Sequence, residues 1–416
     1  MDEQKTIFLE LGHFKIHIYL QKLHKLLLMR PTVLRLTATI LIFSGIVQTT
    51  KAQSADPINV VTTAVPFLRI SADARAAGMG DLGVATSPDA NASFWNLAKV
   101  PYNTNKGGIS ASYTPWLKDI LNDVYLASVA GYYKFDDQQA ISGSLRYFSL
   151  GNIQFTDNLG NDLNTFRPRE LGIDVGYSRK LSDKSGIGVG LKYIYSNLAQ
   201  GPAAGNNYKA ASAVAGDLAY FYNGHNDLGQ GWAFGAVLSN LGSKISYTDN
   251  ADQKDYIPAN LGLGSTYTRV FNSANSLTFG IDVNKLLVPT PPADPATPQQ
   301  LTEYRSKSVM SSWFTSFSDA PGGFSEEMKE FQISFGAEYW YNNQFALRTG
   351  YFYEDKTKGN RRYFTMGVGI KYQSFGLDFS YLIPSGSGVD RNPLSNTLRF
   401  SLHFAFDGSG GTTTTN

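Results

Sequence analysis

Apolar and small polar residues alternate along most of the chain between residues 107 and 406. The alternating segments run for about ten residues and are separated by residues typical of turns. In the last segment Leu398, Phe400 and Leu402 fall on one face, and Arg399 and Ser401 fall on the other. A strand alternates its faces with period two, so each segment predicts a ribbon with one apolar and one more polar face. Repeated segments of this kind are typical of a transmembrane β-barrel.

The alternation and the turn signals together predict about fourteen strands. The predicted strands span residues 107–113, 124–135, 140–150, 171–181, 187–196, 211–222, 232–241, 260–270, 277–286, 331–341, 345–353, 363–372, 375–382 and 397–406. An even number is usual for single-chain bacterial barrels. The fold predicted for residues 106–406 is therefore all-β, a 14-stranded antiparallel transmembrane β-barrel.

The connections between these strands alternate in length. Short ones such as 342–343 and 373–374 take turns with long ones such as 151–169 and 287–330. Outer-membrane barrels place short turns on the periplasmic side and long loops outside the cell, whereas a soluble sandwich has no reason to separate its loops in this way. The lengths therefore support the barrel and predict which end faces outward.

The more polar faces of the predicted strands carry charges of both signs. These interior positions are Arg146, Asp174, Lys192, Asp217, Asp282, Glu338, Arg348, Lys371, Asp378 and Arg399. Paired interior charges avoid the cost of isolated ones, so the mixed set favours a structural ion-pair network over a selective ion path. The segment 124–135 alternates poorly, and the pattern does not assign its faces.

The chain ends differ in character from the predicted barrel. Arg30 and Arg35 precede an apolar stretch at 36–47, and Thr50-Lys51-Ala52 follows. A basic start, a short apolar core and a small-residue exit predict a secretory signal peptide, cleaved after Ala52. Met29 would make a normal start, so 1–52 is interpreted as a signal peptide with a mis-assigned upstream extension. Residues 407–416 are predicted to form a flexible tail.

Residues 53–105 do not resemble a pair of strands. A short stretch at 71–77 could form about two helical turns, and Gly78-Met79-Gly80-Asp81-Leu82-Gly83 follows it. These glycines match a dinucleotide-binding pattern by letter, but that pattern has meaning only inside a βαβ unit, which this region lacks. We expect instead a compact N-terminal plug whose glycines allow close backbone packing inside the barrel mouth.

This region also carries a family resemblance. The residues that carry it are Thr63-Ala64-Val65-Pro66-Phe67-Leu68-Arg69-Ile70, Asp73-Ala74-Arg75, Gly78-Met79-Gly80-Asp81, Gly83-Val84-Ala85-Thr86-Ser87-Pro88-Asp89-Ala90 and Trp95-Asn96-Leu97-Ala98-Lys99. The first four stretches resemble the start of PorV-type outer membrane proteins of the Bacteroidetes type IX secretion system, which are related in fold to FadL-like channels. The last resembles the hatch motif of that superfamily, with Leu97 where a proline is expected. The plug residues singled out are Pro66, Phe67, Asp73, Arg75, Gly78, Gly80, Asp81, Trp95 and Asn96.

Composition adds little to this picture. The mean hydropathy of −0.21 and the net charge of +2 look ordinary, because only every second residue of a barrel strand meets lipid. The 24 Tyr and 26 Phe suit interfacial girdles. The net charge gives no sign of nucleic-acid binding. Because the chain has no Cys and its His residues are scattered, the sequence indicates no metal site, cofactor or nucleophile–base arrangement. An outer-membrane protease is the enzyme alternative, but the predicted external loops contain no His.

The long loops hold the candidate partner surface. Loop 287–330 contains several prolines, which exclude the hydrogen-bond ladders of a regular sheet. Both this loop and the first loop contain aromatic residues that we expect to be exposed. The candidate partner-binding residues are Trp116, Leu117, Trp313, Phe314, Phe317 and Phe324. Two interpretations of loop 287–330 stay open: it packs on itself, or it forms a surface for a partner. Trp116 is also a candidate anchor at the membrane interface.

The resemblance implies a non-enzymatic role in the outer membrane. PorV-type proteins bind the C-terminal domains of secreted cargo, associate with the translocon barrel of the type IX system and deliver cargo to the surface attachment complex. Two alternatives stay open: a FadL-like channel for hydrophobic small molecules with the plug as its gate, and a purely structural subunit of a surface complex. A channel predicts an apolar pocket beneath the plug and an opening in the wall.

Overall fold

Fourteen antiparallel strands close into a barrel in the computed structural model of the chain, because the last strand pairs with the first. The structure describes residues 58–116, 123–156, 159–203, 206–249, 254–292, 295–385 and 397–407, all within the compact unit Pro57–Asn416. The predicted signal peptide, Leu117 and the tail beyond residue 407 lie outside the described residues. The boundaries predicted for the signal peptide and the tail therefore stay predictions.

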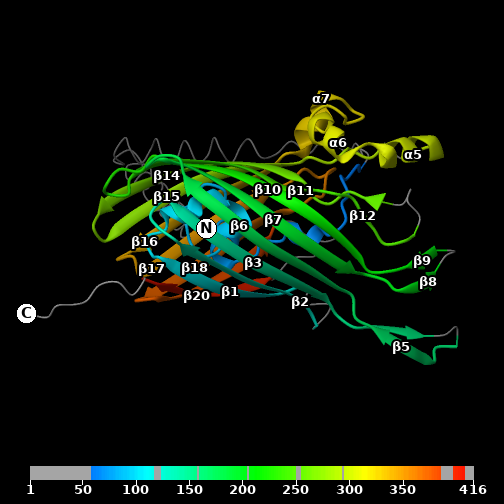
Figure 1. The fold of residues 1–416 in the computed structure, drawn as a ribbon, viewed down its shortest axis with the longest axis horizontal. Coiled ribbons are helices and arrows are strands. Elements are labelled where there is room, and N and C mark those ends of the chain that lie inside the picture. The colour runs from blue at the N-terminus through cyan, green and yellow to red at the C-terminus, as the bar shows by residue number, and fades with distance from the viewer. Residues whose placement is uncertain are drawn as a thin grey trace, which may run out of the picture. The chain divides into compact units, whose positions relative to one another are not determined.

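The barrel strands follow one another around the wall in chain order (Figure 1). They are β1 (Gly107–Pro115), β2 (Val124–Lys134), β3 (Gln139–Leu150), β6 (Arg169–Lys180), β7 (Ser185–Asn197), β10 (Ala211–Asn223), β11 (Gly231–Gly242), β14 (Asn260–Asn272), β15 (Asn275–Leu286), β16 (Gln332–Tyr341), β17 (Phe345–Tyr353), β18 (Arg362–Tyr372), β19 (Phe375–Pro384) and β20 (Leu398–Phe406). Every predicted strand corresponds to one of these, so the predicted fold class and strand number are confirmed.

Short turns gather at one end of the barrel and long connections at the other, which we call the short-turn end and the long-loop end (Figure 1). Asn342 and Asn343 both adopt left-handed backbone angles, with φ of 52° and 51°, as a tight hairpin turn requires. The long connections carry three small hairpins, β4 (Ile153–Thr156) with β5 (Asp162–Phe166), β8 (Gly201–Ala203) with β9 (Asn206–Tyr208), and β12 (Ile245–Ser246) with β13 (Lys254–Asp255).

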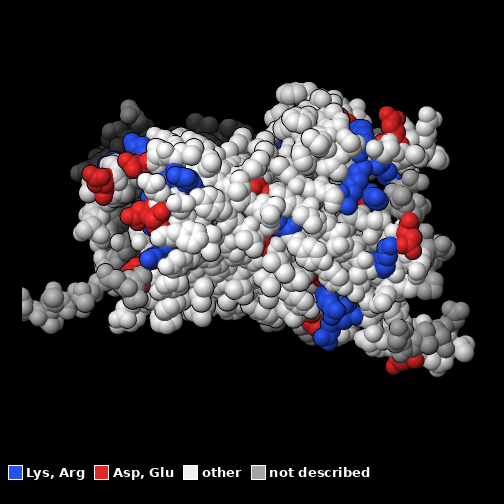
Figure 2. All heavy atoms as spheres, viewed as in Figure 1, with Lys and Arg blue, Asp and Glu red and all other residues white. Residues whose placement is uncertain are grey.

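The outward face of the wall is apolar. Val175, Leu191 and Leu347 are 64%, 71% and 60% exposed although they lie in the middle of strands. Charged side chains gather toward the two ends of the barrel, and the band between them is largely uncharged (Figure 2). Among the described residues no helix is long and apolar enough to cross a membrane.

Aromatic rings border this apolar band at both ends. Toward the long-loop end, Tyr125 packs between Tyr113 and Tyr147, with ring centroids 5.5 and 6.2 Å away. Toward the short-turn end, the Trp232 ring lies 5.0 Å from that of Tyr267. Amphipathic rings favour the membrane–water interface, so the two groups mark the borders of the lipid-facing band.

The strand β2, whose faces the sequence pattern did not assign, turns Val124, Leu126 and Ala130 inward. These apolar side chains face the barrel interior because part of the plug there is apolar too: Val124 and Leu126 belong to one buried cluster with Phe67. An apolar inward face next to an apolar outward face removes the alternation that the other strands show.

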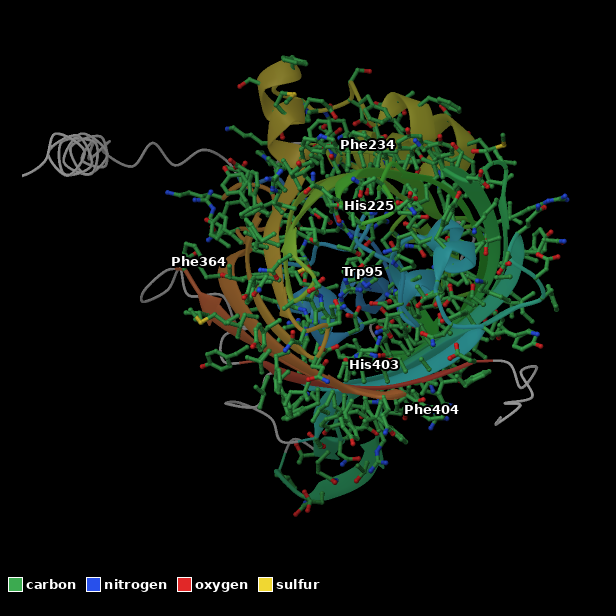
Figure 3. All side chains as sticks on the ribbon, turned by 90° about the vertical axis from the view of Figure 1, so that its left-hand side faces the viewer. Trp95, His225, Phe234, Phe364, His403 and Phe404 are labelled. Carbon is green, nitrogen blue, oxygen red and sulfur yellow. The ribbon has the colours of Figure 1, made fainter. Side chains whose placement is uncertain are left out.

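Residues 65–102, ahead of β1, lie inside the barrel (Figures 1 and 3). Among the described residues this stretch forms four short helices, η1 (Pro66–Arg69), α3 (Ala74–Ala77), α4 (Ala92–Trp95) and η2 (Leu97–Tyr102). The helix predicted over 71–77 is shorter than expected. It begins only after Asp73, whose side chain accepts a hydrogen bond from the Ala76 amide, and its end at Ala77 is followed by Gly78 and Gly80.

Candidate functional site

The plug begins with a buried aromatic anchor. Pro66 occupies the first position of η1, where its fixed φ suits a helix start. Phe67 next to it is fully buried and stacks on Phe148 of β3, with ring centroids 6.4 Å apart and planes 7° apart. The contact ties the first turn of the plug to the inner wall of the barrel.

Asp73 joins two parts of the plug. One carboxylate oxygen caps α3, and the other accepts a hydrogen bond of 2.7 Å from the indole nitrogen of Trp95. Burial raises the pKa of the Asp73 carboxyl, and the neighbouring Asp89 raises it further. Trp95 lies within the ring of strands in Figure 3, so this hydrogen bond braces the interior of the plug.

Arg75 fastens the plug to the wall. Its guanidinium donates to both carboxylate oxygens of Glu338 at 2.9 and 2.7 Å, to Asp89 at 2.8 Å and to Ser87 through two further bonds. All five donor positions of the side chain are thus used. Arg75 is 7% exposed and Glu338 3%, and bidentate pairs in such buried places are geometrically demanding.

The ion pairs continue from Glu338 along the wall. Arg348 of β17 donates to Glu338 at 2.7 Å and to Asp378 of β19 at 2.6 Å. His403 of β20 pairs with the second oxygen of Asp378. On the opposite wall, Lys192 pairs with Asp174 and Asp217 at 3.1 and 3.2 Å. The expected interior ion-pair network is therefore confirmed for these residues, whereas Lys371 is exposed at the short-turn end of its strand.

The Gly78–Asp81 stretch brings the plug backbone against the wall. Gly80 has φ +73°, and a Cβ added there would lie 2.7 Å from the backbone nitrogen of Tyr351. The wall also has a glycine at this contact: a Cβ on Gly350 would lie 2.1 Å from the carbonyl carbon of Met79. Asp81, also at positive φ, accepts a 2.6 Å hydrogen bond from the Tyr363 hydroxyl. The glycines therefore serve close packing.

The hatch-like motif closes the plug. Asn96 is fully buried and caps η2, and its amide also donates to the carbonyls of Val84 and Tyr220, both at 3.0 Å. Leu97 starts the helix in the place of the expected proline and packs against the wall at Gly188. Eight of the nine plug residues that the sequence singled out are thus buried or half-buried in the barrel, whereas Pro66 is exposed and lines the cavity next to Arg69 and Glu354.

Lys99 ends the hatch-like stretch, but sequence reasoning did not single it out as a buried residue of the plug. Lys99 is 2% exposed, and its ammonium group donates to the Gly83 carbonyl at 2.6 Å and to the Thr86 hydroxyl at 3.0 Å; no carboxylate of the described residues forms an ion pair with it. Burial lowers the pKa of Lys99 to about 8. Nothing in the sequence distinguishes it from a surface lysine, because its burial depends on how the plug folds back.

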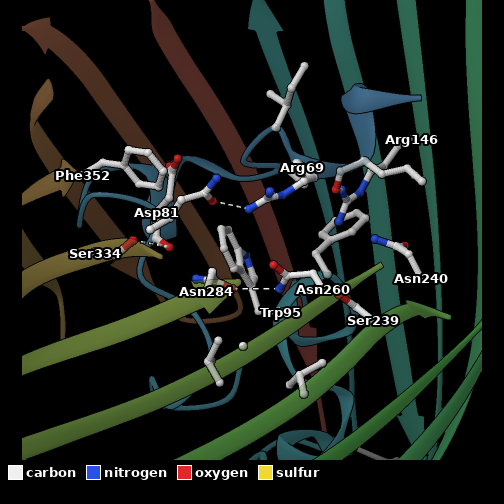
Figure 4. A pocket seen from close by; sticks show the side chains of 18 of the residues that line it. Arg69, Asp81, Trp95, Arg146, Ser239, Asn240, Asn260, Asn284, Ser334 and Phe352 are labelled. Carbon is white, nitrogen blue, oxygen red and sulfur yellow. Dashed lines mark hydrogen bonds between the residues drawn. The ribbon is translucent and has the colours of Figure 1, made fainter. Parts of the chain in front are cut away.

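Three cavities surround the plug. The short-turn cavity, about 550 Å³, lies between the plug and the short-turn end and is lined by Asp89, Tyr132, Trp340, Lys371 and His403 among others. The inner chamber, about 100 Å³, is lined by Arg69, Asp81, Trp95, Arg146, Asn240, Asn260 and Phe352 among others (Figure 4). The outer vestibule, about 290 Å³, is lined by Val60, Pro66, Arg69, Glu354 and Lys358 among others. Arg75 and its partners Ser87 and Asp89 line the short-turn cavity.

The loop 287–330 forms helices, which sequence reasoning missed. They are α5 (Pro298–Ser306), α6 (Val309–Thr315), α7 (Phe324–Glu327) and η3 (Met328–Glu330). The start of α5 did carry a signal: Thr297 and Gln300 form a capping box around Pro298, which sits at the first helical position. We call α5, α6, α7 and η3 the loop helices.

The loop helices expose two apolar pairs at the long-loop end. Met310 and Phe314 are one helical turn apart and 68% and 76% exposed. Phe324 and Met328 have the same spacing and are 80% and 51% exposed. Residues four apart on one α-helix share a face, so Met310 and Phe314 of α6 form one apolar spot, whereas Phe324 of α7 and Met328 of η3 lie on consecutive short helices. We call these four side chains the loop patch.

The other predicted loop residues lie elsewhere. Phe317 is 42% exposed, and Trp313 is half-buried with an indole nitrogen that finds no hydrogen-bond partner among the described atoms. Trp116 turns toward the barrel and packs edge-on against Phe148 at 6.3 Å, next to the apolar cluster of Phe67. It therefore offers little surface to a partner or to the membrane.

Buried ion pairs hold the loop helices in place. Lys285, 1% exposed at the end of β15, pairs with Glu327 at 2.6 Å and Glu330 at 2.7 Å. Lys358 of the β17–β18 connection pairs with Glu326 and with Glu330 at 3.0 Å. Sequence reasoning missed these anchors because the partners lie in different connections of the chain.

The comparisons with known proteins agree with this architecture. A family model described as "Type IX secretion system protein PorV" matches residues 52–293, more than half of the chain. The chain belongs to the PorV family. It is accordingly an outer membrane protein of the type IX secretion system, and the loop lengths predict that the long-loop end is its external end. No curated relative matches the chain by sequence.

Solved barrels from other bacteria are similar in fold. The toluene transporter TbuX of Ralstonia pickettii shares 13% identity at a TM-score of 0.49, over 81% of this chain and 99% of that one. A FadL homologue from Pseudomonas aeruginosa shares 11% identity at a TM-score of 0.46, over 84% and 99%. In this PorV-family chain, the residues that the structure describes hold no group of three or more His, Asp or Glu side chains arranged to bind a metal.

Proposed function

We propose that this protein binds the C-terminal domains of secreted cargo at its long-loop end. It takes them from the translocon barrel of the type IX system and passes them to the surface attachment complex. Membership of the PorV family supports the pathway, and the loop patch is the observation that supports a binding surface. The role is non-enzymatic: the protein recognises folded cargo and moves it without changing a covalent bond.

The loop patch suits protein recognition because it combines exposure with rigidity. Phe314 and Phe324 are more than three-quarters exposed, yet the elements that carry them are tied down by hydrogen bonds. Glu327 of α7 pairs with the buried Lys285 at 2.6 Å, and the carbonyl of Lys307, just ahead of α6, accepts a hydrogen bond of 2.7 Å from Lys244. Apolar side chains held in place lose little conformational entropy on binding, which is a property of binding hot spots.

The position of the patch suits transfer between partners. The loop helices lie at the same end of the barrel as the β4–β5 and β8–β9 hairpins (Figure 1). The apolar wall leaves the sides of the barrel in the outer membrane, in contact with lipid and free to meet the translocon barrel laterally. Cargo bound at the external end would then move with the barrel in the membrane plane.

Co-purification from detergent-extracted outer membranes tests this function. The full-length tagged protein is expected to retain cargo and the translocon subunit. The double variant Phe314→Ala/Phe324→Ala is expected to retain at least tenfold less cargo than the wild type. Phe135→Ala is the matched control, because Phe135 is a 54% exposed phenylalanine next to the short β2–β3 turn at the opposite end. Equal cargo retention by all three proteins would refute the loop patch as the cargo site.

A channel for hydrophobic small molecules is the second candidate. It calls for an apolar pocket beneath the plug and a gap in the wall. The inner chamber is lined by arginine and asparagine side chains beside apolar ones such as Leu68, Phe94 and Phe352, and every neighbouring pair of barrel strands is hydrogen-bonded. The charged lining and the hydrogen-bonded wall favour the shuttle over the channel. Bound lipid without cargo in the co-purified material, and intact surface display of secreted proteins after deletion of the gene, would favour it over the shuttle.

A further inference from the structure

The inner chamber contains more positive than negative side chains. Arg69, Arg146 and Arg361 line it, and Asp81 is the one carboxylate among its lining residues. Neither the loop-binding function nor the Arg75 ion pairs involve these arginines. Buried charges in proteins normally have a counter-ion within reach, so the excess calls for an explanation.

Arg69 is the arginine with the fewest partners. It donates a hydrogen bond to the side-chain oxygen of Gln332, and no ion pair joins it to a carboxylate of the described residues. The nearby Glu354 is already held by Arg361 through two hydrogen bonds, both of 2.8 Å. Burial, together with the charge of Arg361, lowers the pKa of Arg69 to about 10. Arg69 lines both the inner chamber and the outer vestibule.

Arg146 reaches the same chamber from the wall. One nitrogen donates to the Leu68 carbonyl, and the guanidinium lies 4.6 Å from the centre of the Phe94 ring. Arg146 is 6% exposed, and its Nε has no hydrogen-bond partner among the described atoms. The carboxylates that attract it from farther away, Asp174 and Asp217, are bound to Lys192.

The arrangement leaves one side of the chamber free of negative charge. Asp81 lies on the side opposite Arg146 (Figure 4). One of its oxygens accepts from the Tyr363 hydroxyl, and the other has no hydrogen-bond partner among the described atoms. An anion would therefore be held on the side of Arg69 and Arg146.

Access comes from the external end. Arg69, Gln332 and Arg361 line both the inner chamber and the outer vestibule, so the two cavities adjoin there. The chamber volume of about 100 Å³ has room for several waters or for one small oxyanion group. The ligand is therefore either a small free anion or the anionic end of a longer molecule that lies in the vestibule.

We propose that the inner chamber binds an oxyanion, a carboxylate or a phosphate group, through the guanidinium groups of Arg69 and Arg146. Arginine presents planar paired donors that match both groups, and the hydrogen bonds it makes to an anion are stronger than those between neutral groups. The site is separate from the loop patch and does not rest on the shuttle function.

Calorimetric titration of the purified full-length barrel in detergent tests the site. Inorganic phosphate and acetate are each titrated at constant ionic strength, with chloride as the balancing anion. The wild-type barrel is expected to bind at least one of them saturably, and Arg69→Gln to bind it at least tenfold more weakly, since a charged hydrogen bond contributes about one to two decades of affinity. Arg305→Gln, which changes an exposed arginine on α5, is expected to bind like the wild type.

Two further arms complete the experiment. If Arg69→Gln fails to fold, Arg146→Gln takes its place, and Arg69→Lys is expected to retain part of the affinity because the positive charge remains. A short peptide with a free C-terminal carboxylate is compared with its C-terminal amide. Binding of the free acid alone identifies a chain terminus as a source of the anion, whereas binding of inorganic phosphate alone identifies a phosphate group.

The proposal is overturned if neither anion nor the free-acid peptide binds saturably to the wild type. It is overturned equally if binding is unchanged in both arginine variants. Loss of cargo capture by Phe314→Ala/Phe324→Ala with intact anion binding would leave this site standing, so the two proposals can fail separately.

Discussion

Arg75 of the plug and Glu338 of the wall are joined by two parallel hydrogen bonds of 2.9 and 2.7 Å, across 263 residues of sequence. Both side chains are almost completely buried. A bidentate arginine–carboxylate pair fixes both the distance and the orientation of the two elements it joins. This pair therefore sets how the plug sits in the barrel, and the chain of charges through Arg348 and Asp378 extends that constraint to the neighbouring strands.

Removing the charge of Glu338 is expected to loosen the plug. In Glu338→Gln both Arg75 and Arg348 lose their shared counter-ion, and breaking a buried pair from one side typically costs about 3–5 kcal/mol. The midpoint temperature of unfolding in detergent should fall clearly, and protease should gain access to the plug from the short-turn end. Lys209→Gln is the control, because its pair with Asp249 is 51% and 71% exposed and should contribute little. An unchanged midpoint in Glu338→Gln would show that the pair is not the main fastening.

The contact between Gly350 and the plug backbone predicts that alanine substitutions at two glycines of the wall differ sharply in their effect on stability. Gly350→Ala places a Cβ 2.1 Å from the carbonyl carbon of Met79, so the plug or the strand must move. Overpacking of this kind costs about 1–3 kcal/mol or more. Gly143→Ala is the matched control, since the nearest atom to its Cβ lies at 3.4 Å. Thermal unfolding of the two variants side by side measures the difference, and similar midpoints for both would contradict the close packing of the plug.

The barrel could be predicted from sequence much better than the plug and the loops. Alternation and turn residues are local, so all fourteen strands were identified, and only β2 could not be oriented because Leu126 and its neighbours face an apolar part of the plug. The partners of Arg75 could not be predicted, since any of several interior carboxylates would have fitted the pattern. The loop helices were missed although Thr297 and Gln300 carried a capping signal, because the prolines around it were interpreted only as breaks.

Lys99 predicts a pH dependence of stability. Its pKa is about 8 in the folded protein, below its ordinary value of 10.5. Between these two values the unfolded chain binds a proton that the folded chain does not, so stability should rise with pH across this window. Below about pH 8 both states are protonated and the cost of burying the charge is fully present. Lys99→Met removes the titrating group and keeps most of its volume.

Unfolding midpoints of the wild type and Lys99→Met from pH 7 to 10.5 give the measurement. The difference in unfolding midpoint between the two proteins should shrink as the pH rises. The wild type gains stability as Lys99 loses its proton, and the variant has no titrating group at this position. Tyrosines and other lysines titrate in both proteins, so taking the difference cancels their contribution. A difference that stays constant across the range would mean that Lys99 keeps its ordinary pKa in the folded barrel.

The anchors of the loop helices link stability to the proposed cargo site. In Lys285→Met, Glu327 loses its buried cation and Glu330 keeps only Lys358, and burying a carboxylate without a partner is unfavourable. The barrel strands should remain intact, because Lys285 lies at the end of β15. The loop helices should detach locally, and external protease should cleave between residues 298 and 330 much faster. Lys307→Gln is the control, since Lys307 is 36% exposed and makes a single longer pair of 3.6 Å with Asp319.

If the loop patch requires a rigid support, cargo retention should fall in Lys285→Met although Phe314 and Phe324 are unchanged. Faster cleavage with full cargo retention would separate rigidity from recognition and would leave the exposed side chains alone as the basis of binding.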